Sequence, residues 1–284
     1  MKPLSAAWHL LRDTLSGFIE DEALSRGASI AYYTLFSIAP VLLVVVAIAG
    51  LVFGRDAAEG AIVGQFSVLM GHQTAEALQG MVESAAKPHE GTWATVVGVI
   101  VLFIAVSGVF GEVQSAMNAI WKAAPPQTST ISRLLRARLV SMGLVVTSGF
   151  LLTVSLAASA ALASFSTYLK IVFPAVQTAL NLVDIVLSAL LIAGMFAAMF
   201  KILPDIDIAW RDVAIGALAT TALFEAGKYA IAFYIGQSNV ASSYGAAGAL
   251  IVLLVWIYYS AQIFLLGAEF SRAYARRYGS HANP

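Results

Sequence analysis

The chain has 284 residues, of which 60% are hydrophobic and 11% are charged, and its formal net charge is zero. Soluble domains carry about 25% charged residues, so this composition indicates a membrane protein with several spans. A neutral chain gives no reason to expect nucleic acid as a partner. Without cysteine it cannot form disulfides or zinc–thiolate sites, and its four histidines lack metal-binding spacing, so we expect no metal and no other cofactor.

Residues 1–27 are predicted to be a cytoplasmic amphipathic segment. Acidic residues in this segment argue against a cleavable signal peptide. Apolar residues recur at helical spacing between positions 4 and 19, a pattern that suits a helix lying along the cytoplasmic leaflet. The residues of this stripe are Trp8, Leu11, Leu15, Phe18 and Ile19.

Six segments are apolar over the roughly 20 residues that a helix needs to cross the hydrocarbon core. They are residues 28–53, 93–120, 138–165, 173–203, 211–236 and 244–271. We therefore expect an all-α fold, a polytopic membrane protein with six transmembrane helices and additional amphipathic interfacial helices. Residues 1–284 then form a single membrane domain, which ends in a cytoplasmic tail at 272–284.

Residues 54–92 are predicted to form a long outer loop that contains short helices. Two amphipathic stretches, 62–70 and 77–82, are joined there by the sequence MGHQ. We expect two short helices that pack over the outer mouth of the bundle or dip into it. A plain extracytoplasmic loop with incidental helicity is the alternative.

The positions of lysine and arginine predict the orientation. Twelve basic residues fall on one side of the six spans and three on the other. Because basic loops are retained in the cytoplasm, both termini are assigned to the cytoplasm. The basic run of Arg133, Arg136 and Arg138 is expected to contact anionic lipid headgroups at that face.

Four ionisable residues fall inside the predicted spans and away from the span ends: Glu112, Asp184, Glu225 and Lys228. A charge near the bilayer centre costs a few kcal/mol, so such residues usually face the bundle interior or a water-filled cavity. Glu225 and Lys228 are three residues apart and therefore lie on one face of a helix. Asp184 is predicted to lie near the depth of Lys228 and to join them.

The second predicted span carries another polar surface. Gln114 and Asn118 follow each other at helical spacing, and Glu112 lies beside them. We predict that these three form a second polar layer below the first, so that the six residues make up a candidate substrate or proton pathway. Glu269, at the cytoplasmic end of the last span, is expected to be a solvated helix-end acid.

The alternatives for the Glu225–Lys228 pair are a polar path for a substrate or protons, a structural pair that fixes how helices pack, and catalysis. Polar residues do join helices in membranes, at a modest gain in stability. The residue pattern leaves the first two open.

Four sequence blocks occur here in a fixed order. They are GASIAYYTLFSIAPVLLVVVAIAG (27–50), SGVFGEVQSAMNAIW (107–121), FKILPDIDIAWRDVAIGAL (200–218) and SSYGAAGALIVLLVWIYYSAQIFLLGAEFSRA (242–273). Their order and spacing resemble the YihY/BrkB family of bacterial inner-membrane proteins, over about residues 10–275. The resemblance implies a six-helix bundle in the inner membrane and a link to serum resistance and transport. It also brings the older label ribonuclease BN, which we judge to be a misattribution.

We therefore expect a transporter or exporter of an unidentified small solute or lipid, and not an enzyme. Its partners would be the lipid bilayer and that solute or lipid, and an oligomer is compatible with the sequence. The alternatives are a structural or envelope-integrity membrane protein without a substrate and, less favoured, a membrane-bound nuclease. The acids Asp205, Asp207 and Asp212 lie on one short turn, but their placement suits a helix end followed by a helix start.

Overall fold

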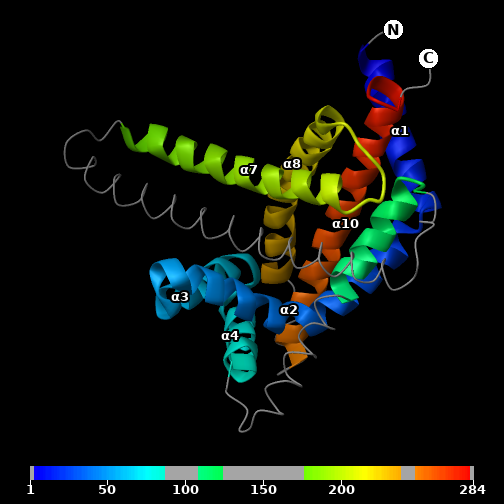
Figure 1. Ribbon diagram of the computed structural model, residues 1–284. Helices are drawn as coiled ribbons and strands as arrows, with labels where there is room; N and C mark the ends of the chain where they lie inside the picture. The colour runs from blue at the N-terminus through cyan, green and yellow to red at the C-terminus, as the bar shows by residue number, and fades with distance from the viewer. Residues whose placement is uncertain (1–2, 87–107, 124–175, 238–246, 282–284) are drawn as a thin grey trace.

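The computed structural model describes residues 3–86, 108–123, 176–237 and 247–281, and the regular structure in these ranges is helical. The expected all-α class is therefore confirmed for this part of the chain. The helices are α1 (Pro3–Glu20), α2 (Ala23–Phe53), α3 (Arg55–Met70), α4 (His72–Ala86), α7 (Val176–Ile202), α8 (Trp210–Gln237) and α10 (Gly248–Tyr278). A further helical segment covers residues 108–120. The start of α1 and the end of α10 lie at the same end of the molecule, which we call the terminal end (Figure 1).

Within the described residues, two helices are long and apolar enough to cross a membrane, α7 over Ile185–Ile202 and α10 over Gly248–Tyr278. A third candidate is α2, if its halves Ala23–Ala39 and Val41–Leu51, which meet at 46°, form one broken span. The break falls at Pro40, which has no backbone N–H to donate to the helix.

These helices do not establish whether the other predicted segments cross the membrane. The predicted fifth span, residues 211–236, is occupied by α8, which is not among the apolar helices above. The third predicted span, 138–165, and the first part of the second lie outside the described residues. The count of six spans therefore stays a prediction.

Two consecutive helices, α3 and α4, occupy most of the segment predicted as the outer loop. Each begins after a glycine with a positive φ angle, +82° at Gly54 and +86° at Gly71, a conformation that other residues rarely adopt. Both helices pack on each other and on α2. Leu42 of α2 and Leu78 of α4 belong to one apolar cluster with Trp256 of α10.

A second apolar cluster lies near the terminal end. Phe200 of α7 and Phe264 of α10 are fully or almost fully buried, with ring centroids 5.2 Å apart. Phe196 of α7 is stacked on Phe200 and tilted relative to Phe264. Met117 and Ile120, from the segment 108–120, are fully buried in the same cluster. Helices α2, α7, α8 and α10 and this segment thus share one core.

Close packing of α8 on α10 is possible because small residues alternate along their interface. Gly216 lies against Ser271, and Gly267 lies against Thr220. Further along, Gly227 lies against the Tyr259 hydroxyl, where any side chain would overlap the ring. Such contacts between small residues let two membrane helices approach each other closely.

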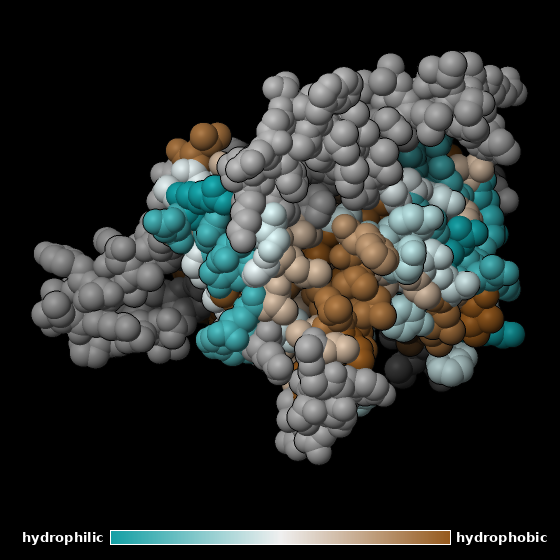
Figure 2. Space-filling view, turned by 90° about the horizontal axis from the view of Figure 1, so that it is seen from below, coloured by the Kyte–Doolittle hydropathy of each residue, from teal (hydrophilic) through white to brown (hydrophobic). Residues whose placement is uncertain are grey.

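Large apolar side chains also cover parts of the outer surface. Leu182 and Ile185 of α7, and Tyr229 and Phe233 of α8, are all exposed. Figure 2 shows apolar side chains gathered in the middle of the face seen from below, with hydrophilic side chains on either side. Apolar surface of this extent is typical of a protein that meets lipid or another apolar partner.

We predict that Gly267→Ala destabilises the fold by about 1–3 kcal/mol, because the new methyl group overpacks the α8–α10 interface. A Cβ at this position would overlap the Thr220 side chain and lie 2.8 Å from its Cβ. The melting temperature in detergent should fall. Gly194→Ala in α7, where no described atom lies within 4 Å of the added Cβ, is the control and should not lower it. Equal melting temperatures for the two variants would contradict the interface described here.

Candidate functional site

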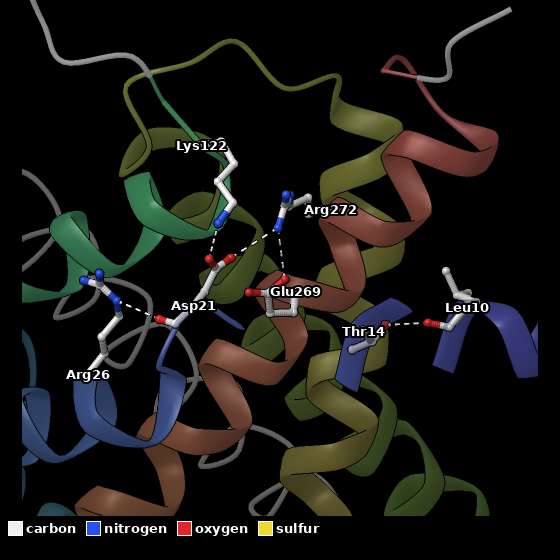
Figure 3. A network of polar contacts seen from close by, with 7 residues as sticks. All are labelled: Leu10, Thr14, Asp21, Arg26, Lys122, Glu269 and Arg272. Atoms are coloured by element: carbon white, nitrogen blue, oxygen red, sulfur yellow. Dashed lines mark hydrogen bonds and ion pairs between the residues drawn. The ribbon is translucent and has the colours of Figure 1, made fainter. Parts of the chain in front are cut away.

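A cluster of charged side chains joins several chain segments at the terminal end (Figure 3). At its centre is Asp21, which lies between α1 and α2 and whose side chain is 5% exposed. Its carboxylate pairs with Lys122, just beyond the segment 108–120, and with Arg272 of α10, at 3.2 Å. One carboxylate therefore ties the start of the chain to two elements that are remote in the sequence.

Glu269 belongs to the same cluster. It lies one turn before Arg272 on α10, with 3.6 Å between its Oε2 and the Arg272 Nη1 atom. Its side chain is only 2% exposed, and its Oε1 has no hydrogen-bond partner among the described residues. The expectation of a solvated helix-end acid is wrong, because Gly17 of α1 packs directly onto this carboxylate, where any larger residue would overlap it.

The backbone is unusual at two residues next to Asp21, one adjacent in the chain and one paired with its side chain. Glu22, which follows it, and Lys122, which pairs with it, have φ angles of +54° and +50°, and no other non-glycine residue in the described ranges has a positive φ. A non-glycine residue keeps a positive φ angle where the contacts around it hold the backbone in that conformation. Arg26 contributes by donating from Nε to the Asp21 carbonyl oxygen at 2.9 Å. The charged cluster thus holds the turn between α1 and α2.

A polar cleft of about 390 Å³ opens between α1 and α10 beside this cluster. At one wall, Asp13 of α1 pairs with Arg277 of α10 at 3.3 Å. The buried Glu269 also lines the cleft. The full lining consists of Asp13, Ser16, Gly17, Glu20, Glu269, Arg272, Ala273, Arg276 and Arg277.

Glu225 and Lys228 form an ion pair on α8, with 2.5 Å between Oε2 and Nζ. Their side chains are 31% and 25% exposed. The Lys228 ammonium group also lies 5.3 Å from the centre of the Tyr229 ring. Counted from Trp210, Glu225 is about 22 Å along the helix axis, so the pair lies well inside α8. The ion pair and the ring contact that these two charged groups make among the described residues both lie within α8.

The polar residues of the second predicted span are engaged elsewhere. The Asn118 amide donates to the Asp205 carboxylate at 2.8 Å and accepts from the Asp205 backbone N–H at 2.8 Å. Gln114 donates to the same carboxylate at 3.3 Å. These amides hold the turn that follows α7. Glu112 is half-buried on the same segment, and the side chain of Asp184, in α7, lies outside the described residues.

The three acids near that turn do not converge on one point. Asp207 lies 3.5 Å from the Lys201 ammonium group. Asp212 is buried and accepts hydrogen bonds from Ser280, at 2.9 Å from its backbone N–H and 2.7 Å from its hydroxyl. Throughout the described residues, no three histidine or acidic side chains are close enough together to hold a metal ion.

Sequence reasoning missed the cluster around Asp21, although one signal was available. Glu269 and Arg272 show the same acid-then-base spacing of three residues as Glu225 and Lys228, and Glu269 lies inside a predicted span. The other half of the cluster, Asp21 and Lys122, comes from segments that look like ordinary solvated helix ends. Only the fold brings these four charges together.

A family model described as virulence factor BrkB matches residues 14–284. The chain belongs to this family. The match confirms the YihY/BrkB resemblance that the four sequence blocks indicate, and it identifies the residues around Asp21 and Glu225 as parts of a BrkB-family membrane protein.

Relatives of this BrkB-family chain are named UPF0761 membrane proteins. One from Vibrio campbellii is 30% identical over 254 residues, which cover 87% of this chain and 76% of that protein. One from Alcanivorax borkumensis is 29% identical over 262 residues, 90% of this chain and 58% of that protein. The chain thus spans well under two thirds of the Alcanivorax relative. No solved structure matches.

We predict that Asp21→Asn destabilises the fold by about 3 kcal/mol, because Arg272 and Lys122 lose the buried anion that they share. Thermal unfolding in detergent measures the change. Asp13→Asn is the matched control, because the Asp13 side chain, which pairs with Arg277, is 56% exposed. Such an exposed pair contributes less than about 1 kcal/mol. If both variants melt at the same temperature, the Asp21 cluster does not hold these segments together.

Proposed function

We propose that this BrkB-family protein is a transporter or exporter of the bacterial inner membrane, with both termini in the cytoplasm. It would move a small solute or lipid along a polar path between helices. One observation carries the proposal, namely that α8 holds a partly exposed ion pair, Glu225 and Lys228, well inside its length. Charges at such a depth are costly in lipid and usually mark a path for ions or substrates.

The contacts of the pair favour this function over a structural one. A pair that serves only to fix helix packing should connect two helices. Glu225 and Lys228 instead neutralise each other within α8, and the described residues supply no partner from another helix. The cluster around Asp21, by contrast, joins separate segments through its ion pairs. The chain therefore already has a charged cluster that binds its elements together, at a different place.

The pair also has the chemistry that a polar path requires. A quarter or more of the surface of each side chain is exposed, so a passing group has access to both charges. A cationic group on the cargo would replace Lys228 at the Glu225 carboxylate, and an anionic group would replace Glu225 at the Lys228 ammonium. Because each charge keeps its intrahelical partner between such events, neither is left bare in a medium of low dielectric constant.

The alternative is an envelope-integrity protein without a substrate, which the Asp21 cluster would suit as a rigid scaffold. The two functions differ in one measurable respect. A scaffold moves no solute, and its Glu225–Lys228 pair would matter only for stability.

We predict that Glu225→Gln and Lys228→Met reduce the flux of the transported solute or lipid in reconstituted liposomes by about 10-fold to 100-fold. Loss of a charge-assisted hydrogen bond of about 1.5–3 kcal/mol would produce an effect of this size. The panel of cargoes should contain cationic, anionic and zwitterionic solutes and lipids. Glu59→Gln is the matched control, because it removes the acid of the Arg55–Glu59 pair on α3, at 2.8 Å.

A charge-swapped double variant, Glu225→Lys with Lys228→Glu, separates the two functions. It keeps an ion pair at the same spacing, so the melting temperature should remain close to that of the wild type. Under the transport proposal its flux still falls, because each charge has changed position. Wild-type protein that moves none of the cargoes, or a swapped variant with full flux, would contradict the proposal.

A further inference from the structure

The first helix presents four large apolar side chains away from the protein. Trp8 is 68% exposed, Leu11 and Leu15 are 53% and 54% exposed, and Ile19 is 75% exposed. Positions 8, 11, 15 and 19 follow the helical repeat, so they form one continuous stripe along α1. We call these four residues the outer stripe.

The face of α1 that packs on the protein instead carries small and polar residues beside the half-buried Leu10 and Phe18. Thr14 is almost fully buried and bonds back to the Leu10 carbonyl oxygen at 2.8 Å. Gly17 packs on Glu269, and Asp13 pairs with Arg277 across the polar cleft. A helix on a water-soluble protein shows the reverse arrangement, with its apolar stripe on the core and its polar face outside. In α1, by contrast, an apolar stripe faces outward.

The charged cluster prevents α1 from turning the outer stripe inward. Asp21, at the end of α1, is held by Lys122 and Arg272 at the same time. The contact of Gly17 with Glu269 fixes the rotation of the helix near its C-terminal end. The outer stripe must therefore be covered by something other than the described part of this chain, or stay in water.

We propose that the outer stripe of α1 is a membrane-binding surface, inserted at the boundary of headgroups and acyl chains on the terminal side of the bilayer. The next helix, α2, also exposes large apolar side chains, Leu24, Tyr32 and Phe36, on the half that belongs to a candidate span. A lipid surface is the partner that both helices can meet at once. A tryptophan near one end of the stripe suits the interface, where its ring anchors amphipathic helices.

The structure also corrects the stripe expected from the sequence. Phe18 was predicted to share it, but this side chain packs against the buried core cluster with Phe200 and Phe264. The membrane-binding surface is therefore narrower, and the side of α1 next to it carries His9 and Ser16. Ser16 lines the polar cleft.

Spin labelling tests this surface directly, because the chain has no cysteine of its own. Single cysteines replace Leu11 and Leu15 on the outer stripe, and His9 and Ser16 on the polar side as controls. Each is labelled with a nitroxide in the full-length protein, reconstituted in liposomes of phosphatidylethanolamine and phosphatidylglycerol. Power saturation then compares collisions with oxygen, which concentrates in lipid, and with a water-soluble nickel chelate.

Labels at 11 and 15 are expected to collide mainly with oxygen, and labels at 9 and 16 mainly with nickel. The controls lie on the same helix, so the contrast between the two sides reports its orientation and not its general depth. Nickel-dominated collisions at all four positions would overturn the proposal. Dipolar broadening of the labels at 11 and 15 that disappears on dilution with unlabelled protein would overturn it too, since a second copy would then cover the stripe. Neither outcome depends on whether the protein transports anything.

Discussion

The close approach of α8 to α10 is the contact on which the rest of the described structure depends. Glycine or a small polar residue faces a side chain at each step, as with Gly216 and Ser271, Thr220 and Gly267, and Gly227 and Tyr259. Since lipid gives helices no hydrophobic reason to associate, close van der Waals contact has to supply the attraction. The paired helices present the surface on which α7 and the segment 108–120 build their core and on which α1 and α2 pack.

Two kinds of charged site follow from this arrangement. At the terminal end, Asp21, Lys122 and the α10 residues Glu269 and Arg272 come from three segments, and their pairing fixes a turn whose backbone is otherwise unfavourable. Within α8, Glu225 and Lys228 pair with each other, and among the described residues their ion pair joins no second element. The first arrangement is suited to rigidity. The second leaves its charges accessible while α8 stays packed on α10.

Local patterns predicted the elements well and the long-range contacts poorly. Apolar runs indicated helices at α2, α7, α8 and α10, and amphipathic stretches around Gly71 indicated those at α3 and α4. Gly227 had no interpretation from the sequence, because its reason is the Tyr259 ring on another helix. Glu269 was assigned to water because nothing near it in the sequence shows that Gly17 covers it. In both cases the neighbour that explains the residue lies on another helix, and a pattern within one segment of sequence does not reveal it.

The hydrogen bonds between Asp212 and Ser280 have a consequence for the order in which the chain is assembled. Asp212 is buried near the start of α8, while its two donors come from a residue 68 positions later, beyond the end of α10. During synthesis, α8 therefore leaves the ribosome with a carboxylate whose final partner does not yet exist. Closing so long a loop costs little more entropy than closing a short one, but it must wait for α10 to be inserted. The start of α8 thus reaches its native environment only when α10 and the residues after it are in place, so the folding of the two helices is coupled.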